Sequence, residues 1–326
     1  MRRIWREIGT ALLLGGVLPS LMVNASALLA RENPKELPIT VTTAPPTAPA
    51  SAMDVRLRQS DGTMEEMGLE EYLTGVLLGE VPADFEPEAL KAQAVAARTY
   101  TAKAVLTGGK HADGSLCADF ACCQAYLSET EYLAAGGTEE DLEKIRAAVM
   151  DTAGLVLSFE GGLIEATYFS CSGGRTEDAQ AVWGTDYPYL RAVASPGEEG
   201  AAHYQDVISV DTNAFQKTLG RVLEGKPETW FGTRTLTPGE GVDTLEIGGE
   251  SYSGVRLRQL FGLPSTAFTV SVEGKQILFR TKGFGHRVGM SQYGADAMAV
   301  TGSDFREILG HYYPGTTVCN IKEYIY

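Results

Sequence analysis

Residues 69–106 constrain this chain most, because two helices are predicted there and one charged side chain breaks their apolar pattern. In the first helix, apolar residues with the spacing of one buried face occupy positions 69, 72, 73, 76 and 77. Glu80 continues that series, so a carboxyl group stands where the pattern calls for an apolar side chain. Pro82 disfavours the helical conformation at Val81. We therefore expect Glu80 near the C-terminal end of the helix, facing a cleft.

This predicted position has consequences for the chemistry of Glu80. Apolar neighbours penalise the ionised carboxylate, and the negative end of the helix dipole acts in the same direction. Both effects would raise the pKa and keep the carboxyl group protonated at neutral pH, as a general acid requires. Two plainer interpretations remain open at this point: a surface glutamate at a fraying helix end, or a carboxylate paired with an arginine.

The second predicted helix, residues 87–106, is rich in alanine and begins at Pro87, which suits a first helical turn. Arg98 shares a face with small and apolar residues of this helix, so its side chain is predicted to point inward. A buried guanidinium needs a carboxylate or a substrate acceptor. The pattern predicts either a substrate-binding arginine beside Glu80 or a salt bridge that stabilises the fold.

A cluster of soft metal ligands follows the second helix. The segment 110–124 contains one imidazole and three thiols, those of His111, Cys117, Cys122 and Cys123. These four side chains match the ligand types of a structural tetrahedral zinc site. A disulfide and a site that uses only three of these ligands are the alternatives. No organic cofactor is expected.

The N-terminal region has the features of an exported chain. Arginines at positions 2, 3 and 6 precede an uncharged stretch, residues 8–30, which at about 1.5 Å per residue would span a bilayer core. We interpret residues 1–30 as a signal anchor, with cleavage after export as the alternative. Residues 31–53 contain five prolines and are predicted to form a linker.

The remaining residues, 54–326, are long enough for one large domain or two lobes. Within them a smaller, mostly β lobe is predicted at about 198–280. A hairpin is predicted from 155–159 and 163–170. The expected fold class is α+β, with a helical catalytic region packed on a mixed or antiparallel sheet. The net charge of −15 argues against nucleic acid and anionic lipid as partners.

Several motifs resemble the stage II sporulation protein D family in order and over roughly 55–325. They are Gly79–Pro82, Leu90–Tyr100, Ser170–Thr176, Pro188–Val193, Gly283–Ala295 and Ile308–Thr316. The pair Cys122-Cys123 departs from the His–Cys pair that many members carry.

The resemblance implies a lytic transglycosylase that acts in sporulation and engulfment. It would cleave the bond between N-acetylmuramic acid and N-acetylglucosamine in glycan strands stripped of their peptides, with Glu80 as the catalytic acid and 1,6-anhydro products. The implied substrate-binding residues are Arg98, Ser170, Ser172, Thr176, His286, Gln292 and Tyr293. The implied partners are an amidase and a membrane protein of an engulfment complex. The implied location is the cell membrane, crossed once, with the catalytic domain outside the cytoplasm.

Two other functions remain compatible with these residues. A hydrolytic muramidase would need a second carboxylate, and Asp84, Glu86 and Glu88 are close enough in sequence to supply one. A noncatalytic cell-wall scaffold would bind glycan and release no product.

Overall fold

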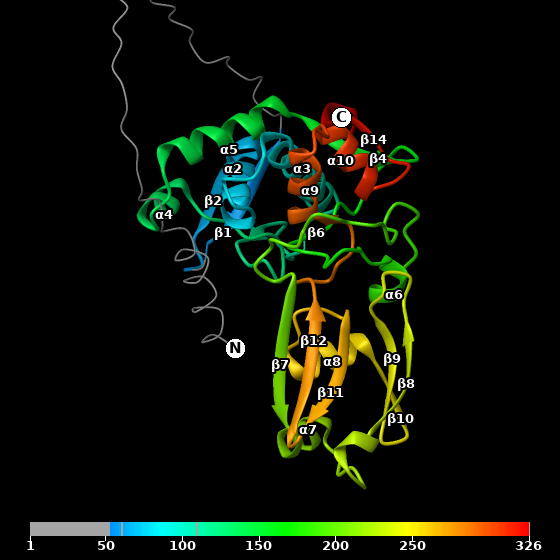
Figure 1. Cartoon of the computed structure of the whole chain (residues 1–326). Helices are drawn as coiled ribbons and strands as arrows, with labels where there is room; N and C mark the ends of the chain where they lie inside the picture. The colour runs from blue at the N-terminus through cyan, green and yellow to red at the C-terminus, as the bar shows by residue number, and fades with distance from the viewer. Residues whose placement is uncertain (1–52, 60, 109, 326) are drawn as a thin grey trace, which may run out of the picture.

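The computed structural model describes residues 53–59, 61–108 and 110–325, so the predicted anchor and most of the linker lie outside the described residues. Helices and small, mostly antiparallel sheets are combined in one chain, which confirms the α+β class. Figure 1 shows a helix-rich main lobe and, below it, a lobe made mainly of strands. None of the helices in the described residues is long and apolar enough to cross a membrane.

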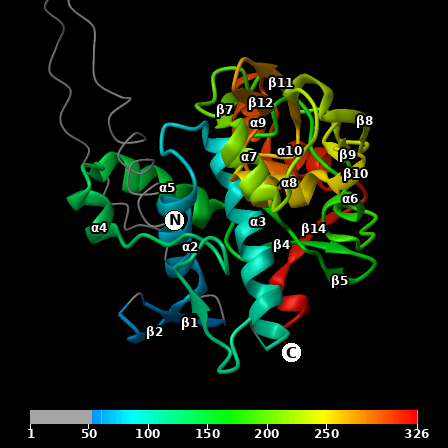
Figure 2. The same cartoon turned by 90° about the horizontal axis from the view of Figure 1, so that it is seen from below.

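Helices α2 (Leu69–Glu80) and α3 (Pro87–Leu106) form the centre of the main lobe. The boundary of α2 confirms the prediction that the helix ends at Glu80, since Val81 is extended (φ −130°, ψ 147°) ahead of Pro82. Helix α3 is buried along most of its length because its alanines let neighbours approach closely. It packs against α2, α5, α9, α10 and strand β4, and Figure 2 shows it crossing the main lobe.

The other helices of the main lobe surround this pair. Residues 136–137 separate α4 from α5, as the two glycines there predict. The bounds are α4 Glu129–Ala134, α5 Glu139–Asp151, α6 Ala179–Trp183, α9 Gln292–Val300, α10 Phe305–Tyr312 and a final 3₁₀ turn Ile321–Glu323.

Strands of the main lobe form three small sheets. The strands are β1 Asp54–Arg58, β2 Met64–Gly68, β3 Leu116–Cys117, β4 Leu155–Phe159, β5 Gly162–Leu163, β6 Tyr168–Phe169, β13 Met290–Ser291 and β14 Thr317–Asn320. Their orders are β2-β1-β3, β14-β4-β5 and β13-β6. The parallel pairing of β3 with β1 places the start of the Cys-rich segment against the N-terminal hairpin.

The predicted hairpin is only partly correct. Strand β4 pairs with a two-residue β5 around a turn at Glu160 and Gly161, both of which have positive φ. The chain then leaves this sheet, and β6 pairs in parallel with β13 instead. This pairing joins segments about 120 residues apart and brings Tyr168 opposite Met290.

A second hydrophobic core lies in the mostly β lobe, formed by side chains between residues 208 and 279. Its strands are β7 Gln205–Asp211, β8 Phe231–Leu236, β9 Val242–Ile247, β10 Glu250–Ser253, β11 Phe268–Glu273 and β12 Gln276–Lys282. They form two sheets, β11-β12-β7 and β10-β9-β8. Helices α7 (Thr212–Leu219) and α8 (Gly254–Phe261) and a 3₁₀ turn at Pro227–Thr229 complete the lobe.

Candidate active site and metal centre

Glu80 is the last residue of α2, and its carboxyl group is held from two other segments. The backbone N–H of Ala125 donates to Oε1 at 2.7 Å, and the side-chain amide of Gln292 makes a long contact of 3.5 Å from Nε2 to Oε2. The side chain is half-buried, so part of it remains accessible.

Gly79 allows the loop that carries Ala125 to approach the end of α2. A Cβ atom at position 79 would lie 3.0 Å from the Ala125 carbonyl carbon and 3.0 Å from the Tyr126 nitrogen. One turn earlier, a Cβ at Gly75 would lie 2.2 Å from the Tyr126 ring. The two glycines therefore form a flat helix surface against which the loop packs, and this contact places the Ala125 N–H on Glu80.

Burial raises the pKa of Glu80 above its ordinary value, and the hydrogen bonds from Ala125 and Gln292 oppose that rise without cancelling it. The cause agrees with the one predicted from the sequence, which was removal of a carboxylate from water. A carboxyl group with this property can hold a proton at a pH where an exposed glutamate has lost it.

Gln292 reaches Glu80 because it is the first residue of α9. Ser291 caps this helix by accepting from the Gly294 N–H, and it is also the β13 residue that pairs with Phe169 of β6. The Ser170 carbonyl accepts from the Tyr293 N–H at 3.1 Å, which fixes the same turn. Gln292 itself is 6% exposed. It was predicted to contact substrate, and in this structure its side chain contacts the carboxyl group of Glu80.

Arg98 corrects the expectation of a substrate-binding arginine. Its side chain has no exposed surface, and it forms a salt bridge of 2.6 Å from Nη2 to Glu70 Oε2. The other donors of the guanidinium bind the Val149 and Leu155 carbonyls and the Thr152 hydroxyl. The structure therefore favours the fold-stabilising alternative and leaves no donor of Arg98 for a glycan.

Ser172 and Thr176 are also internal rather than exposed to a substrate. Both are fully buried. The Ser172 hydroxyl donates to the carboxylate of Glu198, which also accepts from the backbone N–H groups of Ser172 and Gly173. The Thr176 hydroxyl donates to the Arg191 carbonyl and accepts from the Val193 N–H. Because these hydroxyls are buried and bonded to neighbouring segments, they hold the loop in shape.

Ser170, Tyr293 and His286 keep partly accessible side chains. The ring of Tyr293 packs edge-on against Phe85, with centroids 5.0 Å apart. The imidazole of His286 lies between Phe169 and Trp183, and burial lowers its pKa to about 4, so it is neutral at pH 7. Their contact with substrate stays a prediction.

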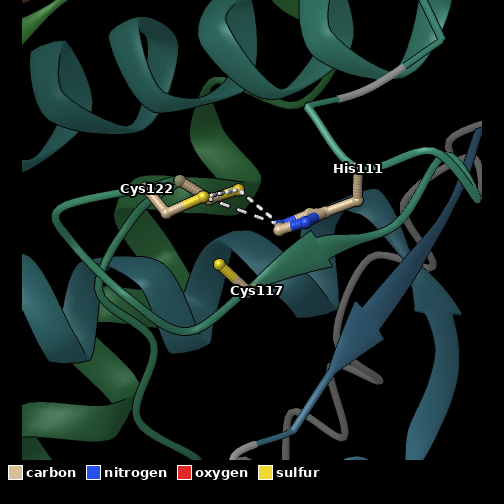
Figure 3. Close-up of side chains that lie close together, drawn as sticks. His111, Cys117 and Cys122 are labelled. Carbon is tan, nitrogen blue, oxygen red and sulfur yellow. Dashed lines mark hydrogen bonds between the residues drawn. The ribbon is translucent and has the colours of Figure 1, made fainter.

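The four predicted metal ligands come together. The ligand atoms of His111, Cys117, Cys122 and Cys123 all lie within 4.8 Å of one another. His111 Nε2 is 3.7 Å from the sulfur of Cys122 and 3.7 Å from that of Cys123, and the two sulfurs are 3.9 Å apart. Figure 3 shows the side chains of His111, Cys117 and Cys122 pointing toward one another. All the cysteines are free thiols, so the disulfide alternative is absent from this structure.

This donor set fits a tetrahedral metal ion. Metal–ligand bonds of about 2.0–2.3 Å place neighbouring donors about 3.4–3.8 Å apart, close to the separations of His111 and the adjacent cysteines. Burial raises the pKa of the Cys123 thiol to about 12, so in the absence of a cation the thiolate is unfavourable there. The cluster can hold a metal ion, which would favour the thiolates that bind it.

Sequence reasoning missed three groups that organise the site. They are the Ala125 N–H, which binds Glu80, and two carboxylates, Glu70 and Glu198, which fix Arg98 and the loop at 170–174. A backbone amide has no signal in a sequence. The carboxylates resemble many others in an acidic chain, and only their long-range partners distinguish them.

Comparisons with known proteins agree with the motifs. A family model described as "Stage II sporulation protein" matches residues 58–159. The chain is 39% identical to stage II sporulation protein D of Bacillus subtilis (strain 168), over 82% of this chain and 79% of that protein. It is 38% identical to the Bacillus amyloliquefaciens protein of the same name, over 86% of this chain and 83% of that protein.

A more distant relative is the amidase enhancer of Bacillus subtilis (strain 168). It is 29% identical over 76% of this chain but only 40% of its own length. The two sporulation proteins are matched along most of both chains, and the matching motifs include the ones around Glu80. The chain therefore belongs to the stage II sporulation protein D family.

Proposed function

We propose that this protein is a peptidoglycan lytic transglycosylase that cleaves the bond between N-acetylmuramic acid and N-acetylglucosamine in peptide-stripped glycan strands during engulfment. The observation that carries the proposal is the state of Glu80, a half-buried carboxyl group at a helix end whose pKa is raised by burial. Membership of the stage II sporulation protein D family supports the sporulation setting.

The proposed reaction uses Glu80 first as an acid and then as a base. The protonated carboxyl group donates its proton to the glycosidic oxygen as an oxocarbenium-like centre develops at C1 of the muramic residue. The resulting carboxylate removes the proton of the C6 hydroxyl, whose oxygen closes on C1 to give the 1,6-anhydro end. Because the nucleophile belongs to the substrate, one carboxylate is sufficient.

The surroundings of Glu80 favour this reaction over hydrolysis. Ordinary glycosidases place a second carboxylate about 5–9.5 Å from the acid. In the described residues, the groups that bind the Glu80 carboxyl group are the Ala125 N–H and the Gln292 side-chain amide. Glu88, one of the alternatives, is instead paired with Lys91 and accepts from the Phe305 N–H.

Analysis of the products in water enriched with heavy oxygen tests the reaction. Purified glycan strands should give 1,6-anhydromuramic ends without label, and Glu80→Gln should bind the strands without cleaving them. Labelled reducing ends would identify a muramidase, whereas binding without any product from the unaltered protein would identify a scaffold. Unlabelled anhydro ends that persist in Glu80→Gln would show that another group is the acid.

We propose zinc as the metal of the cluster formed by His111, Cys117, Cys122 and Cys123. Three thiolates and one imidazole are the ligand types that structural zinc prefers, and they leave no open position for a water molecule. The ion would cross-link the loop and would take no part in cleavage of the glycan. The same loop continues into Ala125, whose N–H binds Glu80.

We propose further that residues 1–30 anchor the protein in the cell membrane with the remaining residues outside the cytoplasm. The flanking arginines and the uncharged stretch at residues 8–30 support this orientation. The likeness to a protein named amidase enhancer supports an amidase as a partner. A second membrane protein of the engulfment complex completes the proposed assembly.

A further inference from the structure

Two consecutive residues of one loop hold Tyr168 and Glu80, and no hydrogen bond joins these two groups directly in the described residues. The side-chain amide of Gln124 donates to the Tyr168 hydroxyl at 2.7 Å, and the backbone N–H of the next residue, Ala125, donates to Glu80 at 2.7 Å. The loop that positions the carboxyl group therefore also positions the phenol.

A second segment links the same two groups. In the parallel pairing of β6 with β13, Tyr168 is opposite Met290, and Gln292 follows two residues later with its amide 3.5 Å from Glu80. The phenol and the carboxyl group are thus fixed relative to each other from both sides. Burial raises the pKa of Tyr168, and Glu80 raises it further in its carboxylate form, so the phenol remains protonated.

The hydrogen bonds of Gln124 determine what the phenol can do. Thr101 Oγ1 donates to Gln124 Oε1 at 2.7 Å, which leaves the NH₂ group of Gln124 to face Tyr168. The Tyr168 oxygen is therefore an acceptor in this pair, and its own proton is directed elsewhere. Among the described residues, Gln124 is the hydrogen-bond partner of the phenol.

We propose that Tyr168 is a second catalytic residue, whose phenol donates a hydrogen bond to a sugar oxygen at the bond that Glu80 protonates. This inference rests on the proposed function and deepens it. Tyr168 and Glu80 are both partly exposed residues, as a site that receives an amino-sugar chain requires. No proton leaves the phenol, because its role is to stabilise charge on the substrate oxygen during bond breakage.

The variant Tyr168→Phe tests the proposal, with Tyr72→Phe as the matched control. Tyr72 is fully buried in α2, and its hydroxyl has no hydrogen-bond partner in the described residues, so its removal should leave cleavage unchanged. Loss of one donor to a developing charge costs about 10²–10³ in rate. For Tyr168→Phe we expect kcat on purified glycan strands to fall by about that factor, with KM nearly unchanged.

A combined variant separates catalysis from support of the fold. In Tyr168→Phe the buried amide of Gln124 loses its acceptor, which by itself can lower stability. Gln124→Leu and Thr101→Val combined with Tyr168→Phe remove all three buried polar partners, so the melting temperature should recover while kcat stays low. Recovery of kcat together with the melting temperature would overturn the proposal, because Tyr168 would then only have supported Gln124.

The failure of this inference can be told apart from failure of the proposed function. Full kcat in Tyr168→Phe, in a preparation whose unaltered protein gives anhydro products, overturns the role of Tyr168 alone. Absence of product from the unaltered protein overturns both.

Discussion

The guanidinium of Arg98 donates to Glu70 at 2.6 Å, so it neutralises the carboxylate ten residues before Glu80 rather than Glu80 itself. Both partners lie in the packed centre of the main lobe, with side-chain exposures of 0% and 11%. Glu70 also accepts from the Gly154 N–H, which ties the pair to the start of β4. Among the described residues, no cationic side chain pairs with the carboxyl group of Glu80, which is compatible with its raised pKa.

Arg98→Ala should therefore destabilise the protein. Loss of one partner from a buried ion pair leaves an uncompensated charge and costs about 3–5 kcal/mol. The matched control is Arg146→Ala, which breaks an exposed pair with Glu129 and should change the free energy of unfolding by about 0–1 kcal/mol. Urea denaturation of both variants measures the difference. A stable Arg98→Ala protein with severely reduced cleavage would restore the role in substrate binding.

The features that the sequence predicted are local ones. The end of α2 at Glu80 depends on Pro82, and the start of α3 depends on Pro87. The metal cluster was also predictable, because its four ligands lie within thirteen residues. In each case the interacting residues are neighbours in the chain, so their spacing carries the information.

The features that the sequence did not predict depend on contacts between distant segments. Strand β6 was predicted as part of a hairpin, yet it pairs with β13, and a two-residue strand has too little periodicity to indicate its partner. Ser172 was predicted to face a glycan, but its hydroxyl donates a hydrogen bond to Glu198 within a buried loop. Polar side chains beside glycines are typical of both binding loops and tightly bonded internal loops.

The free energy of unfolding should depend on pH through Glu80. Burial raises its pKa in the folded state above the ordinary 4.5. Below pH 4.5 the folded and unfolded states both hold the proton, so ionisation of Glu80 does not lower the free energy of unfolding there. As the pH rises toward the folded-state pKa, the unfolded state loses its proton first and stability falls, by at most about 1.4 kcal/mol per pH unit.

Glu80→Gln has no titrating carboxyl group, so it should be more stable than the unaltered protein at pH 7. Near pH 4 the two proteins should have nearly equal free energies of unfolding. Thermal unfolding across this range measures the effect, and the exposed Glu71→Gln on the same helix is the control. The cleavage rate should fall as the pH rises through the same interval. A stability difference that does not change with pH would contradict a raised pKa.

Metal analysis should find about one zinc ion per chain, and removal of the ion should lower the melting temperature. At free zinc 100-fold above its Kd, binding to the folded state contributes about 2.7 kcal/mol. His111→Ala should lose both the ion and this stabilisation, whereas Cys319→Ser, which lies outside the cluster, should keep both. Protein without zinc, or a native disulfide among Cys117, Cys122 and Cys123, would contradict the assignment.

Gly79→Ala should reduce cleavage more than it reduces stability. The new Cβ would lie 3.0 Å from the backbone of Ala125 and Tyr126, so the loop must move by a few tenths of an ångström. That movement lengthens the hydrogen bond of 2.7 Å from the Ala125 N–H to Glu80. Because a misplacement of 1 Å can cost about 10²-fold in rate, we expect roughly a tenfold loss in kcat.

The matched control for Gly79→Ala is Gly310→Ala. Gly310 is also helical, in α10, but a Cβ there would have no atom within 4 Å. Alanine in that helix should stabilise the protein by about 0.5–1 kcal/mol and leave cleavage unchanged. At position 79 the same gain in helix propensity offsets part of the clash, so the net change in unfolding free energy should stay within about 1 kcal/mol. Full activity in Gly79→Ala would show that the Ala125 N–H does not govern the acid, and the loop would then serve the fold alone.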